Sequence, residues 1–422
     1  MDLTDRVVPV VVADDLTGAT DTAVQFARTG WEIELLLSPA ASGAAGSAFA
    51  VTSDVRALAP AGAQEGTRAA VADALSRAPR AHVYLKIDST MRGPVAAQIA
   101  GALDAWRDGH PDAFAVLCPA YPELGRTVAD GVLRVDGVPV AETALRHDPV
   151  SPMTASDLAA LVPGALPLAE PGERPEEAVS RRLADPASAG GVFFADARTR
   201  ADLETLGRAL ASHPRIIPVG SAGLAIELSR RWHPDPEPAP IVLEERAGGS
   251  GALLQVSSLN PVSRAQLAHL REAWAGTVAV VEPDVDTARS ATALHDLCAR
   301  RADELAAADL VILAAPEARG STGAAVQIAD ALGAATAALT GTRRWAAVGL
   351  IGGDGARAVL EHLEVASMRV IAPVAEGMPL SIISTGPASG TPIFTKAGGF
   401  GSVDALTTAL QRLLGRDDRR TL

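Results

Sequence analysis

The sequence predicts an α/β protein of two domains, each a largely parallel sheet flanked by helices. Three observations lead to this fold class. The chain has 422 residues, which exceeds what one ordinary hydrophobic core accommodates. Short apolar runs alternate with longer amphipathic stretches, as is typical of repeated βα units. A proline-rich stretch interrupts this alternation after residue 231, so we expect one domain over residues 1–232, a linker over 233–251 and a second domain over 252–422.

The first domain is expected to open on the strand Val7–Ala13, because a continuous β-branched run suits a strand buried on both faces. A helix is expected to follow over about Thr22–Thr29. Another is expected after Pro94, because proline suits a first turn and an apolar face then recurs at helical spacing. That face comprises Val95, Ile99, Leu103 and Trp106. The other strands expected here are Ile33–Leu37, Val83–Ile87, Phe114–Cys118, Val192–Ala195 and Ile216–Val219.

The linker carries prolines at positions 234, 236, 238 and 240 and ends in a Gly/Ser cluster. Proline at every second position excludes a helix or a central strand, so an extended connection is expected. The βα alternation restarts beyond it. The strands expected there are Leu253–Val256, Val278–Val281, Leu310–Leu313, Ala346–Ile351 and Met368–Ile371.

The composition argues against several functional classes. The formal net charge is −13 without a Lys/Arg-rich run, whereas a nucleic-acid partner requires a basic face. Cys118 and Cys298 form no CxxC pair, so two buried thiols in a reducing cytosol are expected, with a single disulfide as the alternative. No apolar run approaches about 18 residues, and the first residues do not resemble a signal peptide. We therefore expect a cytoplasmic protein without a membrane span, for which a homodimer is one admissible assembly.

The basic residues are distributed unevenly. Of the 37 Lys and Arg residues, only Lys86 and Lys396 are lysines. A compact ammonium and a planar guanidinium are not interchangeable, so the two lysines are expected where an ammonium is required. Both lie within glycine-containing motifs, which makes them candidate functional residues.

Two adjacent carboxylates, Asp14 and Asp15, follow the first expected strand in the segment ADDLTGATD. Carboxylates at a strand end suit hydroxyl binding, proton abstraction or a metal ion. The alternative is that one of them only caps the following helix. A cap needs a single acid, so the pair favours a functional role.

A dense polar cluster follows the strand Val83–Ile87, in the segment KIDSTMRGP. The start of a helix there favours an anion such as a carboxylate or a phosphate. Arg92 would clamp a carboxylate with two hydrogen bonds while Asp88 accepts one from a substrate hydroxyl. Lys86 and Ser89 complete the cluster, and Arg126 in the rigid loop PAYPELGRT is a further candidate anion ligand. The alternative is a capped turn with a surface ion pair.

The second domain has three Gly/Ser-rich turns, in the segments SSLNPVS, GGDGA and TKAGGFG. The first two follow expected strands and are expected to open helices, the first of which has Leu267, Leu270 and Trp274 on one face, and the third precedes a last helix. Such turns expose backbone N–H groups that suit the phosphates and ribose of a nucleotide. None of them is a GxxxxGK[ST] P-loop, and none is a GxGxxG after a first strand. The sequence therefore indicates nucleotide binding and disfavours NAD.

At these loops the sequence resembles the four-carbon acid sugar kinases, the family that includes D-threonate, D-erythronate and 3-oxo-tetronate kinases. The matching segments occur in the family's order and span Asp14 to Asp404. They are ADDLTGATD, KIDSTMRGP, PAYPELGRT, DGVPVAET, DPVSP, GSAGLA, VSSLNPVSRAQL, GGDGARAVLEHL, and GMPL followed by TKAGGFG. The resemblance implies a sugar-acid domain over 1–232, a nucleotide-binding domain over 252–422 and an active site in the interdomain cleft.

Carried over by position, the resemblance also implies site residues. Those implied to contact the substrate are Asp14, Asp15, Lys86, Asp88, Ser89 and Arg92. Those implied to contact ATP are Ser258, Gly352, Gly353, Asp354, Gly355, Gly398 and Gly399.

The expected reaction is in-line transfer of the γ-phosphoryl group of MgATP to a terminal hydroxyl of a short sugar acid. We expect Asp15 to orient or deprotonate that hydroxyl, with Asp14 or Asp88 as the alternative. Arg92 and Lys86 would hold the substrate carboxylate, and Lys396 would offset charge that develops on the phosphate. Asp354 is one candidate ligand for Mg²⁺, whose ligands the sequence leaves open.

The sequence departs from the family's usual pattern at six positions. These are Val55, Ala96, Gln98, Ser257, Asn260 and Gly355, where serine, glycine, an acid, glycine, serine and threonine are respectively common. The changes leave the particular sugar acid open. They also motivate two alternatives, a non-catalytic ligand-binding homologue and another ATP-dependent ligase or phosphatase on the same scaffold.

Overall fold

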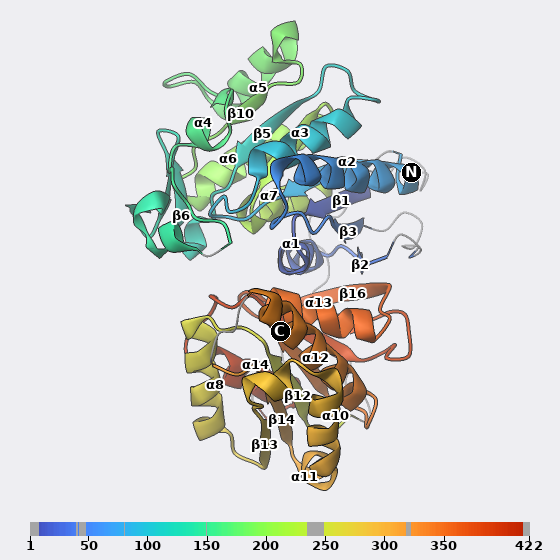
Figure 1. The fold of residues 1–422 in the computed structure, drawn as a ribbon. Helices are drawn as coiled ribbons and strands as arrows, with labels where there is room; N and C mark the ends of the chain where they lie inside the picture. The colour runs from blue at the N-terminus through green and yellow to red at the C-terminus, as the bar shows by residue number, and fades with distance from the viewer. Residues whose placement is uncertain are drawn as a thin grey trace. The chain divides into compact units, whose positions relative to one another are not determined.

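The computed structural model describes residues 8–38, 41, 48–79, 81–148, 150–233, 249–317 and 322–416. The chain divides into two compact units, Met1–Ala239 (unit 1) and Pro240–Leu422 (unit 2). Each contains a mostly parallel sheet with helices on both faces (Figure 1), which confirms the predicted fold class. Most of the predicted linker, residues 234–248, lies outside the described residues, so the linker bounds stay a prediction.

The sheet of unit 1 consists of parallel strands. They are β1 Val8–Ala13, β2 Ile33–Leu36, β3 Ala48–Thr52, β4 Ala81–Lys86, β5 Phe114–Cys118, β9 Leu166–Pro167, β10 Val192–Phe194 and β11 Ile216–Gly220. Their order across the sheet is β2-β3-β1-β4-β11-β5-β10-β9. The central strands are buried along almost their whole length, as their apolar sequences predict.

Helices cover both faces of this sheet. They are α1 Leu16–Arg28, α2 Pro60–Arg77, α3 Val95–Trp106, α4 Leu158–Leu161, α5 Pro175–Ala184, α6 Arg200–Leu210 and α7 Ala222–Trp232. The helices α2 and α3 pack together on one face, and α1 and α7 pack together on the other. A small antiparallel sheet is made of β6 Arg126–Ala129, β7 Val132–Val135 and β8 Val138–Pro139. The short 3-10 turns are η2 Pro122–Leu124, η3 Val140–Glu142, η4 Ala144–His147 and η5 Pro186–Ser188.

The sheet of unit 2 combines parallel and antiparallel strands. They are β12 Ala252–Val256, β13 Val278–Val281, β14 Leu310–Ala314, β15 Ala347–Ile351, β16 Ser367–Ala375, β17 Met378–Ile383 and β18 Pro392–Lys396. The strands β13-β14-β12-β15-β18 are parallel, and β17 and β16 then continue the sheet antiparallel. The helices are α8 Pro261–Ala273, α9 Val285–Ala288, α10 Ala291–Arg300, α11 Ala302–Ala307, α12 Thr322–Thr340, α13 Gly353–His362 and α14 Ala405–Leu413.

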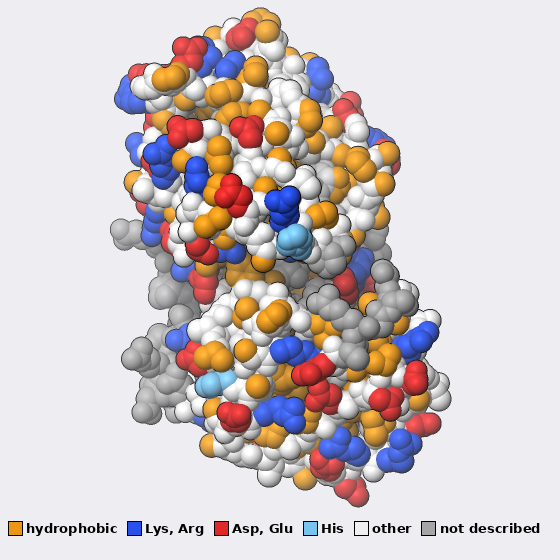
Figure 2. Space-filling model, turned by 60° about the vertical axis from the view of Figure 1, so that its left-hand side comes forward, with side chains coloured by type: hydrophobic (Ala, Val, Ile, Leu, Met, Phe, Trp, Pro, Cys, Tyr) orange, Lys and Arg blue, Asp and Glu red, His pale blue; other side chains and the backbone are white. Residues whose placement is uncertain are grey.

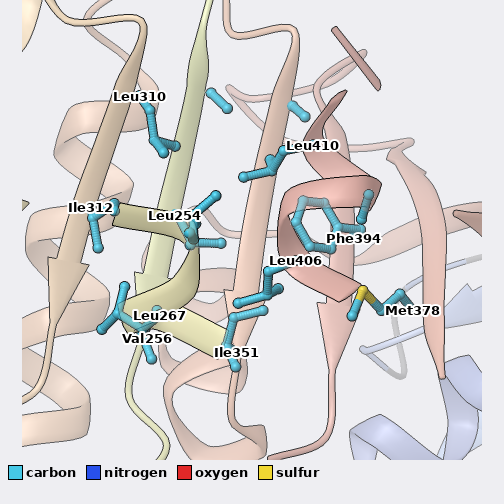
Figure 3. Close-up of a cluster of buried hydrophobic side chains, with 14 of the residues drawn as sticks. Leu254, Val256, Leu267, Leu310, Ile312, Ile351, Met378, Phe394, Leu406 and Leu410 are labelled. Atoms are coloured by element: carbon cyan, nitrogen blue, oxygen red, sulfur yellow. The ribbon is translucent and has the colours of Figure 1, made fainter. Parts of the chain in front are cut away.

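The helices α8 and α14 cover one face of the unit 2 sheet. Figure 3 shows the apolar cluster between this face of the sheet and the two helices. Leu254 of β12 and Phe394 of β18 are fully buried against Leu406 and Leu410 of α14. Burial of one such side chain contributes on the order of 1.5–3 kcal/mol, so the cluster holds the strand ends and the turns that follow them firmly in place. The predicted apolar face of the helix after β12 is confirmed, since Leu267, Leu270 and Trp274 all belong to this cluster.

The first helix of unit 1 differs from the prediction. It begins at Leu16 rather than near Thr22, because Asp15 caps it by accepting a hydrogen bond from Gly18 N at 2.6 Å. Gly18 lowers the apparent helical propensity of this turn, and the cap compensates for it. The start of the helix is thereby placed directly after β1, so both aspartates lie at the junction.

Several elements were not predicted from the sequence. The strand β3 and the helix α2 were missed, as were β6–β8 and the antiparallel pair β17 and β18. The strand β3 is short and alanine-rich, and α2 has few large apolar residues to mark a buried face. Their positions depend on packing against β1 and α3 rather than on local sequence signals.

Within the described part of the chain, no helix combines the length and apolarity that crossing a membrane requires. On the face drawn in Figure 2, acidic and basic side chains are interspersed among the described residues of both units.

Candidate functional site

The predicted polar residues of unit 1 converge at the carboxyl edge of its parallel sheet. The strands β3, β1 and β4 are neighbours, so the segments that follow them lie side by side. Asp14 and Asp15 follow β1, and Asp88 and Arg92 follow β4. Arg56, which was not predicted as a site residue, follows β3 and joins the same group.

Arg56 binds both aspartates. Its Nε donates to Asp14 Oδ2 at 2.8 Å, its Nη2 donates to Asp14 Oδ1 at 2.7 Å, and its Nη1 donates to Asp15 Oδ2. Asp14 is only 1% exposed, so this two-pronged ion pair is what compensates its buried charge. Burial opposes the charge of Arg56, but Asp14, Asp15 and Asp88 together raise its pKa well above the ordinary value.

Asp15 occupies a different environment from Asp14. Burial raises the pKa of Asp15, Arg56 opposes this effect, and the neighbouring charge of Asp14 adds to it. A carboxyl group whose pKa is raised binds a proton closer to neutral pH, which suits a group that accepts a proton from a hydroxyl. The environment therefore distinguishes the two acids, with Asp14 firmly held by Arg56 and Asp15 better suited to proton transfer.

Lys86 is the last residue of β4 and is 4% exposed. Gly18 leaves room for the Lys86 ammonium. A Cβ on Gly18 would lie 2.7 Å from Asp15 Oδ1 and 2.9 Å from Lys86 Nζ. Only glycine allows the ammonium and the carboxylate to approach the helix this closely. Among the described residues, Lys86 has neither a hydrogen bond nor an ion pair within 4.0 Å, so its ammonium is available to a bound anion.

Asp88 and Arg92 form the second ion pair of the site. Arg92 donates from Nε to Asp88 Oδ2 at 3.0 Å and from Nη2 to Asp88 Oδ1 at 2.9 Å, and its Nη1 contacts Asp148 Oδ2 at 3.4 Å. Burial would raise the pKa of Asp88, but Arg92 and Arg56 lower it far below the ordinary range. Thr90 Oγ1 also donates to Asp88. Asp88 is therefore held ionised.

The other two residues predicted in unit 1 differ in placement. Ser89 is half-buried in the loop between Asp88 and Thr90, and its hydroxyl has no hydrogen-bond partner within the described residues. Arg126 begins β6 and donates to the carbonyl of Leu124. It has no hydrogen bond or ion pair to the cluster in the described part of the chain, so the structure does not bring it together with the other predicted residues.

A pocket of about 270 Å³ lies beside the cluster. Its wall comes from the segments that follow β3 and β4 and from the stretch that includes Val150. The residues lining it are Arg56, Ala57, Leu58, Met91, Gly93, Pro94, Val150, Ser151, Pro152, Met153, Thr154 and Leu161. The pocket thus adjoins the ion-paired residues and offers room for a small molecule.

In unit 2 the three predicted turns also lie at one sheet edge. The strands β12, β15 and β18 are neighbours, and Val256, Ile351 and Lys396 occupy one register across them. The turns 257–260, 352–355 and 397–401 follow these residues directly. The sequence prediction that the first two turns open helices is confirmed by α8 and α13.

The glycines of unit 2 allow close backbone approach. Gly352 has a φ of 111°, which side-chain-bearing residues rarely adopt. A Cβ on Gly398 would overlap Ser258 Oγ and would lie 3.0 Å from Asn260 Cβ. Small polar side chains of the first turn therefore pack directly against the glycine backbone of the other two turns. Such a cradle of glycine backbone and small polar side chains is suited to phosphate groups.

Lys396 is the last residue of β18 and is 1% exposed. Its Nζ donates to Ala397 O at 2.9 Å and to Gly398 O at 3.2 Å, and it lies 3.4 Å from Ser263 Oγ. Burial lowers its pKa to about 8. No carboxylate lies within 4.0 Å of this ammonium in the described part of the chain, so its charge is not compensated by the protein there.

Asp354 is exposed in the first turn of α13 and has no ion pair among the described residues. No group of three or more His, Cys, Asp or Glu residues that could hold a metal ion is found within the described ranges. A single free carboxylate beside a phosphate cradle fits Mg²⁺, which binds through one or two carboxylates together with substrate phosphates and water.

Two family models match the chain. A sugar-binding N-terminal domain matches residues 9–228, and a nucleotide-binding C-terminal domain matches residues 253–406. The first match contains the ion-paired cluster of unit 1, and the second contains the three glycine-rich turns of unit 2.

Curated relatives match over nearly the whole chain. A D-threonate kinase from Bordetella bronchiseptica is 39% identical over 96% of this chain and 97% of its own length. A 3-oxo-tetronate kinase from Methylobacterium radiotolerans is 30% identical over 95% of this chain and 98% of its own length. A solved structure from Salmonella typhimurium LT2 is 23% identical, covers 95% of this chain and 98% of its own, and superposes with a TM-score of 0.76, which shows a shared fold. The chain therefore belongs to the family of four-carbon acid sugar kinases, which includes D-threonate, D-erythronate and 3-oxo-tetronate kinases.

Proposed function

We propose that this chain is an ATP-dependent kinase that phosphorylates a terminal hydroxyl of a four-carbon sugar acid such as threonate, erythronate or an oxo-tetronate. One observation carries the proposal. The chain's two lysines are both almost fully buried at the carboxyl edge of a sheet, and neither has an ion pair with a carboxylate among the described residues. A buried ammonium that no carboxylate contacts directly is costly, so each ammonium is best explained by an anionic ligand.

The anion at Lys86 is the carboxylate of the sugar acid. The carboxylates around it, by contrast, are suited to hydroxyl groups, because an ionised carboxylate only accepts hydrogen bonds. Asp88 would accept from one hydroxyl of the acid, and Ser89 and Arg92 complete the contacts. Arg92 is already engaged by Asp88 and Asp148, so Lys86 supplies most of the free positive charge. Arg126 remains a proposed substrate-binding residue, although none of its hydrogen bonds among the described residues joins it to this cluster.

Asp15 is the proposed group that orients the attacking hydroxyl and accepts its proton. Its raised pKa and its position at the helix start support this role. Asp14 is less suited, because its side chain is 1% exposed and Arg56 binds both of its oxygens, whereas the side chain of Asp15 is 26% exposed and Arg56 binds only one of its oxygens. Phosphoryl transfer depends mainly on positioning and on charge stabilisation, and this cluster supplies both through rigid ion pairs.

The anion at Lys396 is the phosphate chain of ATP. Ser258, the turn from Gly352 to Gly355, and Gly398 and Gly399 would surround it with backbone N–H groups and small side chains. Asp354 would hold Mg²⁺, which neutralises phosphate charge when it is bound. Lys396 holds its own loop through hydrogen bonds to the carbonyls of Ala397 and Gly398, and its positive charge would attract the phosphates.

The test is a coupled assay of ADP release from MgATP over a panel of four- to six-carbon sugar acids. We expect a rate of ADP release that depends on the added acid and is highest for four-carbon acids. A ligase would need a second acceptor, a phosphatase would act without ATP, and a non-catalytic homologue would bind an acid without ADP release. Acid-independent ADP release, or none with any acid, would contradict the proposal.

A further inference from the structure

The hydroxyl of Ser257 lies against the first turn of α13, and the proposed function gives it no role. Ser257 Oγ donates to Ile351 O at 3.1 Å. A Cβ on Gly352 would lie 2.5 Å from this oxygen, and a Cβ on Gly355 would overlap it. Glycine stands at both positions, so the hydroxyl of Ser257 fills the space that side chains of the turn would otherwise occupy.

A second polar group lies behind this hydroxyl. Gln255 of β12 is fully buried, and neither atom of its carboxamide has a hydrogen-bond partner among the described residues. Its neighbours at the same register in the adjacent strands are Leu313 and Leu350, both apolar. Burial of an unpaired amide opposes folding, and an apolar side chain of similar size would avoid that cost. The presence of such a group therefore points to a use in the ligand-bound state.

The carboxamide is directed at the same turn. A Cβ on Gly355 would lie 3.2 Å from Gln255 Oε1, so no side chain at position 355 separates the amide from the start of α13. This helix has 10 residues, and no side chain caps its N-terminus. Its first backbone N–H groups are therefore available to an anion. The hydroxyl, the amide and the helix N-terminus thus converge on one place.

We propose that Ser257 donates its hydroxyl proton to a phosphate group of the bound nucleotide, and that Gln255 is the positioning residue that supports the hydroxyl in that state. The inference rests on the proposed function, which places the nucleotide at this turn. A serine hydroxyl has one proton, so donation to a phosphate oxygen requires it to leave Ile351 O. That carbonyl still accepts from Ser257 N at 3.0 Å and Ser258 N at 3.2 Å. After the carboxamide rotates about its last side-chain bond, Ser257 Oγ accepts a hydrogen bond from Gln255 Nε2, which gives the buried amide one partner.

The experiment measures MgATP affinity by calorimetry, steady-state KM values for ATP and the sugar acid, and thermal unfolding, all on the full chain. Ser257→Ala is expected to weaken ATP binding about tenfold, which corresponds to about 1.4 kcal/mol. Gln255→Met is expected to weaken ATP binding about fivefold while the Tm stays unchanged or rises, because the unpaired amide is removed. The KM for the sugar acid should change in neither variant.

The control is Gln98→Met in α3 of unit 1, because Gln98 is also fully buried with both amide atoms unpaired. It should shift the Tm in the same direction as Gln255→Met and leave ATP affinity unchanged. If Gln255→Met raises the Tm and binds ATP as the parent does, the positioning role is wrong. If Ser257→Ala binds ATP normally, the phosphate contact is wrong. Failure of the parent chain itself to bind ATP would instead contradict the proposed function.

Discussion

At the scale of single residues, the ion pair between Arg56 and Asp14 links stability to the site. Replacement of Arg56 by methionine keeps the apolar stem and leaves Asp14 buried without its partner. We expect the free energy of unfolding to fall by about 3 kcal/mol, as is typical when one member of a buried ion pair is removed. Urea denaturation measures this. The matched control is Arg68→Met, whose solvent-exposed pair with Glu65 should contribute little to the free energy of unfolding.

Asp15 is the residue on which the proposed chemistry depends. Asp15→Asn should lower kcat by on the order of 100-fold or more, because the amide cannot accept the hydroxyl proton. ATP affinity should remain normal, since Asp15 lies in unit 1. Steady-state kinetics over a range of ATP and sugar-acid concentrations would separate the two effects. Near-normal turnover in this variant would remove Asp15 from the role of proton acceptor.

The lowered pKa of Lys396 predicts that a rise in pH has opposite effects on the stability of the fold and on ATP affinity. Its folded-state pKa of about 8 lies below the ordinary value of 10.5. Between these two values the unfolded chain holds a proton that the folded chain has lost, so the contribution of Lys396 makes the protein more stable as pH rises through this window. ATP affinity should fall over the same window, because phosphate binds the ammonium form.

The measurement is ATP affinity and urea stability from pH 7 to pH 10 in the parent chain and in Lys396→Met. The variant should bind ATP at least about tenfold more weakly at pH 7 and should lose most of the pH dependence of both quantities. The same pH dependence of ATP affinity in both proteins would show that Lys396 does not contact the phosphates.

At the scale of elements, the start of α1 depends on a glycine. Gly18→Ala places a methyl group 2.7 Å from Asp15 Oδ1 and 2.9 Å from Lys86 Nζ, so one of these groups must move. We expect kcat/KM for the sugar acid to fall at least about tenfold, a loss of about 1.4 kcal/mol in transition-state stabilisation. The control is Gly62→Ala in α2, where the new methyl group meets only Leu58 at 3.7 Å. That change should raise stability by about 0.5–1 kcal/mol and leave kinetics unchanged.

At the scale of the whole molecule, the two units should respond to different ligands. Hydrogen exchange of the full chain with MgATP should protect peptides that contain residues 257–260, 352–355 and 396–399. The sugar acid should protect peptides that contain residues 14–18, 56 and 86–92. Protection arises because a bound ligand restricts the local opening of these turns. Protection of unit 1 peptides by ATP alone would contradict the assignment of the nucleotide to unit 2.

The sequence by itself determined the fold class, most strands of both units and the turns that carry polar residues. It could do so because buried parallel strands are continuous apolar runs, and turns are marked by Gly, Pro, Asp and Ser. It also singled out Lys86 and Lys396, and both proved to be buried strand-end residues. The lysine count and the motifs were therefore enough to identify these two candidate residues.

Only the tertiary structure decided which side chains meet. Arg56 follows a strand that the sequence did not reveal, and its pairing with Asp14 spans 42 positions of the chain. The same applies to Asp148 beside Arg92, and to Ser257 inside the turn around Gly355. Strand order brings these residues together, and it is set by packing between segments distant in sequence rather than by local propensity. For that reason a sequence can show which groups are available, whereas their pairing and their pKa values become definite only when the sheet is assembled.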